Sequence, residues 1–374
     1  MRKAAVFFGG KSCENEISIL TGVFVMNILT GTKFTPVPIY LHTDGGAYTS
    51  KDMQSLETFK KKDITRFQRV VLDGGILYAV YPNKRKMKRL VKIDAAINCC
   101  HGGLGEGGGV SALCALNGIP LASPDLTSSG VFMDKCMTKT VLKALNIPTV
   151  DYIRVNESDY KKRGTFLLKS IERRLKYPVI VKPAHLGSSI GISVARNETE
   201  VKTAIENAFV LDGRVLVEKY LPNKRDVNCG AFTKGGEIFV SEAEEAFGDG
   251  VYSFEEKYIK RTSDGVGGKQ GAKIKRKCLD GDLREKIRSY TRTVYKRMNL
   301  KGVVRMDFLV SEGKAYLCEV NTVPGSLAYY LFCERVSDAR AFFTALLDEA
   351  LTGEDGAEKA LITTGILNGA TMRK

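Results

Sequence analysis

Four polar residues near the end of the chain have the spacing of a phosphate and metal site. Arg305 and Asp307 are two residues apart, as are Glu319 and Asn321, and apolar residues surround both pairs. Because side chains alternate across a strand, each pair would face one side of its strand. Two carboxylates and an amide oxygen suit Mg²⁺ that bridges phosphates. Arg305 would add positive charge for a transferring phosphoryl group or an oxyanion. The alternative is a surface ladder of ion pairs.

A glycine- and serine-rich loop in the middle of the chain has the composition of a phosphate-binding loop. Lys182 ends an apolar segment, and residues 183–191 follow before the next one. Backbone N–H groups and hydroxyls of such a loop can surround a triphosphate. A lysine is seldom buried without a partner, and a phosphate would be a partner for Lys182. The loop differs from a Walker A motif because no Gly-Lys-Ser/Thr leads into a helix. A solvent-exposed hairpin is the alternative.

Two weaker patterns also indicate nucleotide contacts. Glu218 and Lys219 end a predicted strand, where backbone and carboxylate groups can pair with an adenine; a purely structural strand end is the alternative. Residues 103–108 match the G-x-G-x-x-G dinucleotide fingerprint between a strand and a helix, with His101 and Glu106 beside the glycines. The alternative is a tight loop whose glycines adopt positive φ.

Apolar periodicity predicts the elements that carry these motifs. Strands that alternate with helices in the first third indicate a parallel α/β sheet, with added hairpins between residues 43 and 94. Ser12 is the predicted cap of the first helix. The predicted strands are 4–8, 37–40, 95–100, 177–182, 190–194, 215–218, 227–232, 237–241, 303–310 and 314–320. The predicted helices are 16–29, 110–116, 134–145, 198–209 and 282–298. The polar stretch 247–278 is predicted to be a long loop of the kind that forms active-site lids.

The composition narrows the class of protein. Hydrophobic residues make up 44% and charged residues 26% of the 374 positions, as in globular proteins, and no apolar run reaches the length of a membrane span. The apolar run at 4–8 is too short for a signal peptide. Nine cysteines without a C-x-x-C pair favour reduced thiols in the cytoplasm, with no disulfide frame and no zinc site. The net charge of +15 suits anionic small molecules, and no nucleic-acid-binding motif accompanies it.

In this order the motifs resemble the D-alanine–D-alanine ligase family of the ATP-grasp superfamily, from about residue 4 to about residue 335. Residues 9–18 are similar to G-G-x-S-x-E-x-E-[VI]-S, and residues 101–107 to the loop H-G-x-x-G-E-[DN]-G. Met133-Asp134-Lys135 is similar to M-D-K, and residues 182–191 to K-P-x-x-x-G-S-S-x-G. Lys257-Tyr258 resembles the pair in the family's mobile lid, and residues 305–325 resemble its metal segment. Most of these motifs are shared by ATP-grasp enzymes in general. The N-terminal motif together with the lid pair is typical of a much smaller group of enzymes.

The resemblance implies roles for individual residues. The ATP phosphates would be bound by Lys135, Lys182, Gly187, Ser188, Ser189 and Gly191. The rest of ATP would meet Glu218, Lys219, Leu221, Asp226 and Lys257. Two Mg²⁺ ions, with Mn²⁺ as an alternative, would bind Asp307, Glu319 and Asn321. The amino-acid substrates would contact Glu14, His101, Tyr258, Arg305, Gly325, Tyr330 and Leu331. Glu14, Ser188 and Tyr258 would connect to close the lid, while Arg305 and the Gly325 N–H would stabilise the oxyanion.

The resemblance also implies an architecture and an activity. It implies an α/β, three-domain ATP-grasp fold, with an N-terminal parallel α/β domain at 1–123, a central lobe at 124–218 and a C-terminal lobe with lid and metal site at 219–374. It implies ATP-dependent ligation of two D-alanines through an acyl phosphate, for peptidoglycan precursors. The enzyme would be a cytoplasmic homodimer that acts on small molecules, without nucleic-acid or membrane partners.

Two positions depart from the family pattern. Tyr330 stands five residues after Gly325, where the family usually has a serine that contacts the carboxylate of the second substrate, and Gly107 replaces an acid or an amide. These departures leave D-Ala–D-Ser ligation, or another acceptor amino acid, open beside D-Ala–D-Ala ligation. Two other classes also remain: a nucleotide-binding regulatory protein that has lost ligation, and a dinucleotide oxidoreductase that uses residues 103–108.

Overall fold

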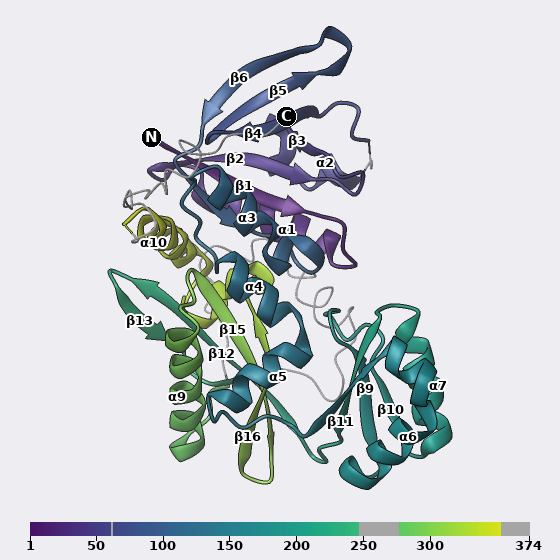
Figure 1. Ribbon diagram of the computed structural model, residues 1–374. Helices are drawn as coiled ribbons and strands as arrows, with labels where there is room; N and C mark the ends of the chain where they lie inside the picture. Colours follow the sequence, from purple (N-terminus) through teal and green to yellow (C-terminus); the bar gives the residue numbers. More distant parts are fainter. Residues whose placement is uncertain (61–62, 247–276, 353–374) are drawn as a thin grey trace, which may run out of the picture.

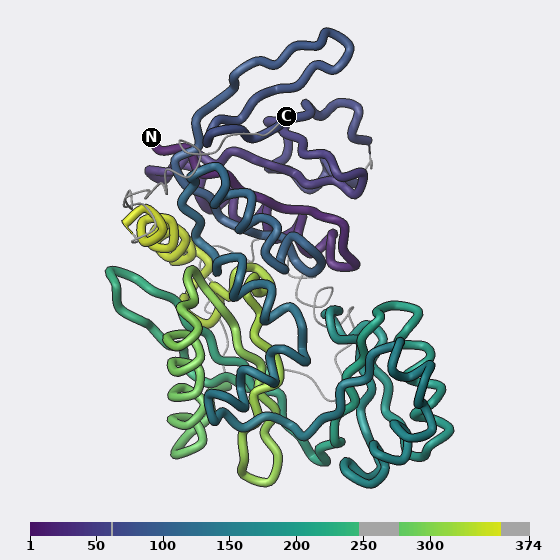
Figure 2. Tube along the Cα trace, in the orientation of Figure 1, coloured from purple at the N-terminus to yellow at the C-terminus, as the bar shows by residue number. Residues whose placement is uncertain are grey.

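Three β-sheets with helices packed against them form the part of the chain described by the computed structural model, residues 1–60, 63–246 and 277–352 (Figure 1). We call them the first, second and third sheets in chain order. The chain builds the three sheets largely in sequence, and its last described helix, α10, returns to lie beside the first sheet (Figure 2).

The first sheet has seven strands in the order β6-β5-β4-β3-β2-β1-β7. Its centre is parallel, because β1 pairs in parallel with both β2 and β7. The remaining neighbours are antiparallel hairpin strands. Both features confirm the sequence prediction. The strands are β1 (Arg2–Gly9), β2 (Phe34–Leu41), β3 (Ala47–Thr49), β4 (Gln68–Asp73), β5 (Ile76–Tyr81), β6 (Lys86–Lys92) and β7 (Ala95–Asn98).

Both faces of β1 are buried, as its unbroken apolar sequence requires. Val6 and Phe8 belong to the core cluster that contains Met26 of α1, whereas Phe7 belongs to the cluster that contains Val110 of α3. Alternate residues of a strand point to opposite faces, so α1 and α3 cover opposite faces of the first sheet. The two helices are α1 (Asn15–Leu29) and α3 (Val110–Leu116).

Ser12 does not cap α1, so that prediction was wrong. The cap position is occupied by Glu14, whose side chain makes no capping hydrogen bond. The Ser12 hydroxyl instead accepts a hydrogen bond from the Glu14 N–H at 3.2 Å and donates one to the His101 carbonyl at 2.6 Å. Ser12 therefore ties the N-terminal motif to the H-G-x-x-G-E loop.

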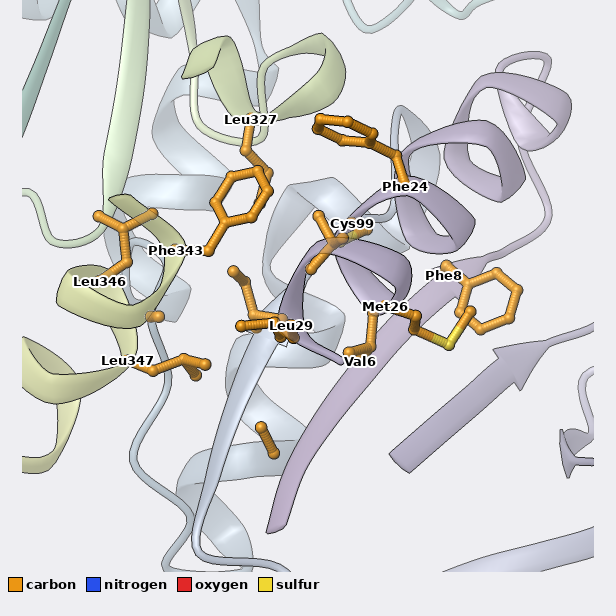
Figure 3. Close-up of a cluster of buried hydrophobic side chains, with 14 of the residues drawn as sticks. Val6, Phe8, Phe24, Met26, Leu29, Cys99, Leu327, Phe343, Leu346 and Leu347 are labelled. Carbon is orange, nitrogen blue, oxygen red and sulfur yellow. The ribbon is translucent and has the colours of Figure 1, made fainter. Parts of the chain in front are cut away.

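Helix α10 (Ala339–Thr352) connects the third sheet to the first. Its Phe343 is fully buried and meets Phe24 of α1 edge to face, with 5.9 Å between the ring centroids. Leu327 lies in the same cluster, beside Phe343 in Figure 3. The turn that follows the third sheet therefore shares a core with the first sheet.

The second sheet is antiparallel, with four strands in the order β10-β9-β11-β8. Helices α6 and α7 share its main apolar cluster. Strand β8 and helix α6 were not predicted from the sequence. In α6, polar residues surround a narrow buried stripe at Leu168, Ile171 and Leu175, which gives little periodic signal. The elements are β8 (Tyr152–Asn156), α6 (Glu157–Leu175), β9 (Val179–Pro183), β10 (Ser193–Ala195), α7 (Glu198–Phe209) and β11 (Arg214–Lys219).

The third sheet runs in the order β13-β12-β15-β16, with β14 also paired to β12. It confirms the predicted hairpin, and α9 confirms the predicted helix after residue 281. Helices α4 and α5 lead from the first sheet toward the second and contact β16. The elements are α4 (Leu126–Met133), α5 (Lys135–Ala144), β12 (Arg225–Lys234), β13 (Glu237–Val240), β14 (Glu244–Glu245), α9 (Gly281–Arg297), β15 (Val303–Ser311) and β16 (Lys314–Asn321).

Short helical segments complete the described chain. They are η1 (Lys51–Gln54), α2 (Glu57–Lys60), η2 (Pro82–Lys84), η3 (Gly105–Gly109), η4 (Gly325–Leu331) and η5 (Val336–Asp338). Among the described helices, none is both long and apolar enough to cross a membrane. All nine cysteines are free thiols, and seven of them are buried.

Candidate active site

The β15–β16 hairpin brings together the four polar residues that the sequence singled out. Asp307 pairs with Glu319 across the strands, and Arg305 pairs with Asn321. The Asn321 amide donates to Asp307 Oδ2 at 3.0 Å, and the Arg305 guanidinium donates to both oxygens of the same carboxylate. Two carboxylates and an amide therefore lie on one face of the hairpin, beside one guanidinium.

A lysine from the central part of the chain lies beside this hairpin. Lys135, the first residue of α5, has its ammonium 3.4 Å from Glu319 Oε1. The same ammonium donates to the Leu186 carbonyl at 2.5 Å, at the start of the glycine–serine loop between β9 and β10. Lys135 thus lies between the acidic hairpin and the loop that the sequence analysis predicted to bind phosphates.

Lys182 shares a buried carboxylate with a second lysine. Glu218 Oε2 lies 2.6 Å from the Lys182 ammonium, and Glu218 Oε1 lies 2.5 Å from the ammonium of Lys139, which is fully buried. Burial alone would raise the pKa of Glu218, but the two ammonium groups hold it below its usual range. Burial lowers the pKa of Lys182, but the Glu218 carboxylate outweighs it and raises that pKa above its usual range. Lys182 is therefore held in its charged form at the end of β9, directly before the glycine–serine loop.

Lys139 was not among the residues predicted from the sequence. Its position four residues after Lys135 places both lysines on one face of α5, and that spacing was the available signal. The other contacts of the Lys139 ammonium are the Thr149 hydroxyl at 2.8 Å and the Val150 carbonyl at 3.1 Å. The three donors of the Lys139 ammonium are therefore all used within the protein, and its contact nearest the predicted phosphate loop is the carboxylate that it shares with Lys182.

The glycine–serine loop reaches the N-terminal motif. The Ser188 hydroxyl donates a hydrogen bond to Glu14 Oε1, although the two residues are 174 positions apart. A Cβ at Gly187 would lie 2.7 Å from Glu14 Oε2, so a larger residue there would displace the Glu14 carboxylate. Ser189 and Gly191 lie in the same loop, and both have positive φ. The loop of the second sheet thus closes against the first sheet at Glu14.

His101 lies inside the protein between the first sheet and the turn after β16. Its Nδ1 lies 2.8 Å from the Val323 carbonyl and its Nε2 lies 2.8 Å from the Thr21 hydroxyl. Burial lowers the pKa of His101 to about 4, so the ring is neutral near pH 7. Glu106 accepts hydrogen bonds from the Val323 and Gly102 N–H groups, and burial raises its pKa to about 7. Direct contact between His101 and a substrate stays a prediction.

The turn after Gly325 has an unusual backbone. Ser326, Leu327 and Ala328 all have positive φ, a conformation that residues with a Cβ seldom adopt and that often accompanies functional sites. Tyr330 from this turn accepts a hydrogen bond from Arg305 Nη1 at 3.0 Å. The Leu331 side chain is buried in the core cluster of the first sheet, and its contact with a substrate stays a prediction. The phenol therefore lies beside the hairpin site.

The remaining predicted ATP contacts are more dispersed. Lys219 is exposed at the end of β11, Leu221 is half-buried just beyond it, and Asp226 is paired with Lys224 at 2.7 Å. Lys257 and Tyr258 lie outside the described residues, as does nearly all of the predicted lid. In the described ranges, no three His, Cys, Asp or Glu side chains form a metal-binding group. A cation at the hairpin would therefore need the amide oxygen of Asn321 as well as the two carboxylates.

Comparison with known proteins identifies the chain's relatives. Two family models match it: the D-ala D-ala ligase N-terminus over residues 3–124, and the D-ala D-ala ligase C-terminus over residues 141–352. The chain belongs to the D-alanine–D-alanine ligase family. It is 36% identical over 339 residues to the D-alanine–D-alanine ligase of Thermosipho melanesiensis, with 89% of each chain covered. It is 31% identical over 363 residues to that of Caldicellulosiruptor bescii, with 94% of each covered.

Solved structures agree with this assignment. The D-alanine–D-alanine ligase of Helicobacter pylori superposes with a TM-score of 0.74 and 26% identity, over 95% of this chain and 99% of that one. The VanG D-Ala:D-Ser ligase of Enterococcus faecalis has a TM-score of 0.71 at 24% identity, over 94% and 98%, and shows the fold alone. The chain is thus an ATP-dependent ligase with the ATP-grasp fold, which replaces the oxidoreductase reading of residues 103–108.

Proposed function

We propose that this ligase joins two D-alanine molecules, forming D-alanyl-D-alanine with conversion of ATP to ADP and phosphate. The observation that supports this most strongly is the β15–β16 hairpin. Arg305, Asp307, Glu319 and Asn321 face one side of it, with Lys135 within 3.4 Å of Glu319. Phosphoryl transfer depends mainly on positioning and on neutralising negative charge, and this arrangement supplies both.

We infer that Mg²⁺ binds at this hairpin, with Mn²⁺ as an alternative. Asp307, Glu319 and Asn321 would hold two ions, since carboxylate and amide oxygens are the donors that these cations prefer. Arg305 donates to both oxygens of Asp307 and the Asn321 amide donates to Oδ2 as well, so Oδ1 is the oxygen of Asp307 that keeps a lone pair for a cation. Bound Mg²⁺ would neutralise charge on the phosphate oxygens of ATP.

Other residues of the chain would bind ATP and the first D-alanine. Lys135, Lys182 and the loop at 187–191 hold the phosphates, and the 218–226 segment holds the adenosine. Glu14 binds the ammonium group of the first D-alanine. One carboxylate oxygen of that D-alanine attacks the γ-phosphorus, ADP leaves, and an acyl phosphate forms.

The second half of the proposed reaction forms the peptide bond. The amine of the second D-alanine attacks the acyl carbon, phosphate leaves with its electron pair, and the new amide loses a proton. Arg305 and the Gly325 N–H would face the oxyanion that forms on the acyl oxygen. Tyr258, in the predicted lid, would help to exclude water, because an acyl phosphate hydrolyses readily.

Tyr330 favours a second candidate for the acceptor. A phenol that accepts from Arg305 replaces the serine that the family pattern places there, so the acceptor pocket differs in shape and in hydrogen bonding. D-serine, or another small D-amino acid, is therefore the alternative second substrate. In either case we infer a dipeptide product that serves peptidoglycan precursor synthesis.

We further infer that the enzyme acts in the cytoplasm as a homodimer. Its domains would span residues 1–123, 124–218 and 219–374.

Phosphate release from ATP across a panel of D- and L-amino acids tests the proposal. The purified chain with ATP and Mg²⁺ should release phosphate with D-alanine alone, and with D-alanine plus D-serine if the alternative holds. L-alanine should give only the background rate. Equal rates with D- and L-alanine, or no release with any D-amino acid, would contradict the proposed function.

A further inference from the structure

His185 lies at the start of the glycine–serine loop, directly after β9 and Ala184. Neither the family pattern nor the sequence analysis gives it a role. Its side chain is about half-buried, at 42% relative exposure, and it lines a polar cavity together with Glu157 and Arg214.

Both ring nitrogens of His185 face carboxylates. Nδ1 lies 3.0 Å from Asp212 Oδ2, and Nε2 lies 3.4 Å from Asp134 Oδ2. The His185 backbone N–H also donates to Asp212 Oδ2 at 2.8 Å. An imidazole can donate from both nitrogens only when it is protonated. Hydrogen bonds to Asp134 and Asp212 accordingly raise the pKa of His185 to about 9.

The charges around protonated His185 nearly cancel one another. Arg214, from β11, forms an ion pair with Asp134 and also donates its backbone N–H to Asp212 at 3.1 Å. Glu157, at the start of α6, lines the same cavity and is paired with Lys161 at 2.6 Å. Two carboxylates thus face one imidazolium and one guanidinium, so deprotonation of His185 would leave a net negative charge.

Asp134 connects His185 to the phosphate-binding lysine. Its Oδ1 accepts the N–H groups of Cys136 at 2.8 Å and Met137 at 3.2 Å, which caps α5. The next residue, Lys135, donates from its ammonium to the Leu186 carbonyl, one residue after His185. The start of α5 and the start of the loop are therefore joined twice, by two neighbouring pairs of residues.

We infer that protonated His185, held between Asp134 and Asp212, is a positioning residue that fixes the 186–191 loop against the start of α5. Lys135 and the loop N–H groups then meet the nucleotide phosphates in one arrangement. This inference rests on the proposed function, since it assigns the loop to ATP. His185 itself touches no ligand in this role.

Nucleotide affinity tests the inference without requiring turnover. The dissociation constant of a non-hydrolysable ATP analogue with Mg²⁺ would be measured by calorimetry at pH 7.5 to 10, for the wild type, His185→Gln and His185→Lys. His42→Gln is the matched control, because His42 also lies beside a carboxylate, Asp44, at 3.1 Å but on the first sheet. The melting temperature of each variant would be recorded alongside.

His185→Gln should raise the dissociation constant about tenfold at pH 7.5, the lower end of the loss seen when an orienting partner behind a metal ligand is removed. The wild-type value should climb toward that of His185→Gln as the pH rises through about 9, whereas His185→Gln should lack this rise. His185→Lys should recover part of the affinity, and His42→Gln should match the wild type.

Two results would overturn the inference. One is a dissociation constant for His185→Gln within twofold of the wild type, even if its melting temperature falls, since that describes a structural role alone. The other is the same pH dependence in both proteins. A wild-type chain that binds no nucleotide at any pH would instead overturn the proposed function, and the inference with it.

Discussion

Arg305 donates two parallel hydrogen bonds to Asp307, from Nε to Oδ1 at 2.7 Å and from Nη2 to Oδ2 at 2.8 Å. The two residues are two positions apart on β15, so the alternation of the strand itself places them on one face. The remaining Nη1 of Arg305 donates to Tyr330 at 3.0 Å. One guanidinium is thus oriented from one side by a proposed metal ligand and from the other by a residue of the proposed acceptor pocket.

Replacement of Glu319 with glutamine should nearly abolish ligation while leaving the fold intact. Glu319 lies opposite Asp307 and beside Lys135, and it would bridge both cations, so its loss removes one negative ligand. We expect kcat to fall by roughly 10³-fold, as for other groups that neutralise charge in a transition state. The measurement is steady-state turnover at saturating Mg²⁺, with circular dichroism to verify folding.

The matched control for Glu319→Gln is Glu312→Gln. Glu312 is exposed at the tip of the same hairpin, outside the proposed metal site. Its substitution therefore shows what a glutamate-to-glutamine change on this hairpin does by itself. It should keep wild-type turnover. A folded Glu319→Gln variant that turns over near the wild-type rate would remove Glu319 from the proposed metal site.

Tyr330→Phe should change the kinetics of the acceptor selectively. The substitution removes only the hydroxyl that accepts from Arg305, so the guanidinium loses one of its orienting partners. We expect the KM for the second D-alanine to rise about tenfold, the cost of about one charge-assisted hydrogen bond. The KM values for ATP and for the first D-alanine should change less.

Tyr330→Ser tests whether the size of the side chain at this position limits the proposed acceptor pocket. Restoring the residue of the family pattern should enlarge the pocket and increase the relative rate with D-serine. Tyr316→Phe, on β16 of the same sheet, provides a tyrosine control. Equal changes in all three KM values, or no change in any, would place Tyr330 outside the acceptor pocket.

Lys139→Met should destabilise the protein strongly at neutral pH. Lys139 is fully buried, and its ammonium partners Glu218, so the substitution leaves a buried carboxylate with one cation fewer. Removal of one member of a buried ion pair costs about 3–5 kcal/mol. Lys143→Met, one turn further along α5 at an exposed position, should change stability by less than about 1 kcal/mol.

The pH dependence of Lys139→Met identifies the cause. The lowered pKa of Glu218 means that its ion pairs stabilise the wild type fully above the ordinary carboxyl pKa of about 4.3 and lose this effect as the pH falls further. The difference in unfolding free energy between wild type and variant should therefore persist from pH 7 to about pH 4.3 and shrink as the pH falls below that value. A difference that stays constant below about pH 4.3 would point to lost packing instead.

Phe343→Ala should weaken the junction between the first and third sheets. Phe343 is fully buried and packs against Phe24 of α1, near Leu327 (Figure 3). Truncation of a buried phenylalanine costs about 3–5 kcal/mol. Urea unfolding measures the loss, with Phe166→Ala as the control, because Phe166 is 61% exposed on α6. Equal effects of the two substitutions would contradict the proposed role of this cluster.

The sequence predicted the elements whose signal is local. The β15–β16 hairpin and α9 have strong periodic patterns, β1 has an unbroken apolar run, and each appears close to its predicted bounds. Strand β8 and helix α6 were missed because α6 carries only a narrow buried stripe among charged residues. Ser12 was misjudged because a hydroxyl before a helix looks like a cap, whereas here it serves the distant carbonyl of His101.

The sequence allowed us to predict which residues of the β15–β16 hairpin form the site. It did not allow us to predict which distant residues contact one another. Arg305, Asp307, Glu319 and Asn321 could be placed together because strand alternation fixes their faces. The pairing of Lys139 with Glu218 joins α5 to β11 over about 80 positions, and no local pattern encodes such a contact. The same limit applies to His185, whose carboxylate partners come from two other segments.

The most direct test of the account follows one oxygen atom through the reaction. D-alanine labelled with ¹⁸O in its carboxylate would be incubated with the purified chain, ATP and Mg²⁺, and the products analysed by mass spectrometry. We expect D-alanyl-D-alanine and ADP in equal amounts, with one ¹⁸O atom transferred to each phosphate released. Release of unlabelled phosphate, label in AMP, or ADP formed without dipeptide would contradict ligation through an acyl phosphate.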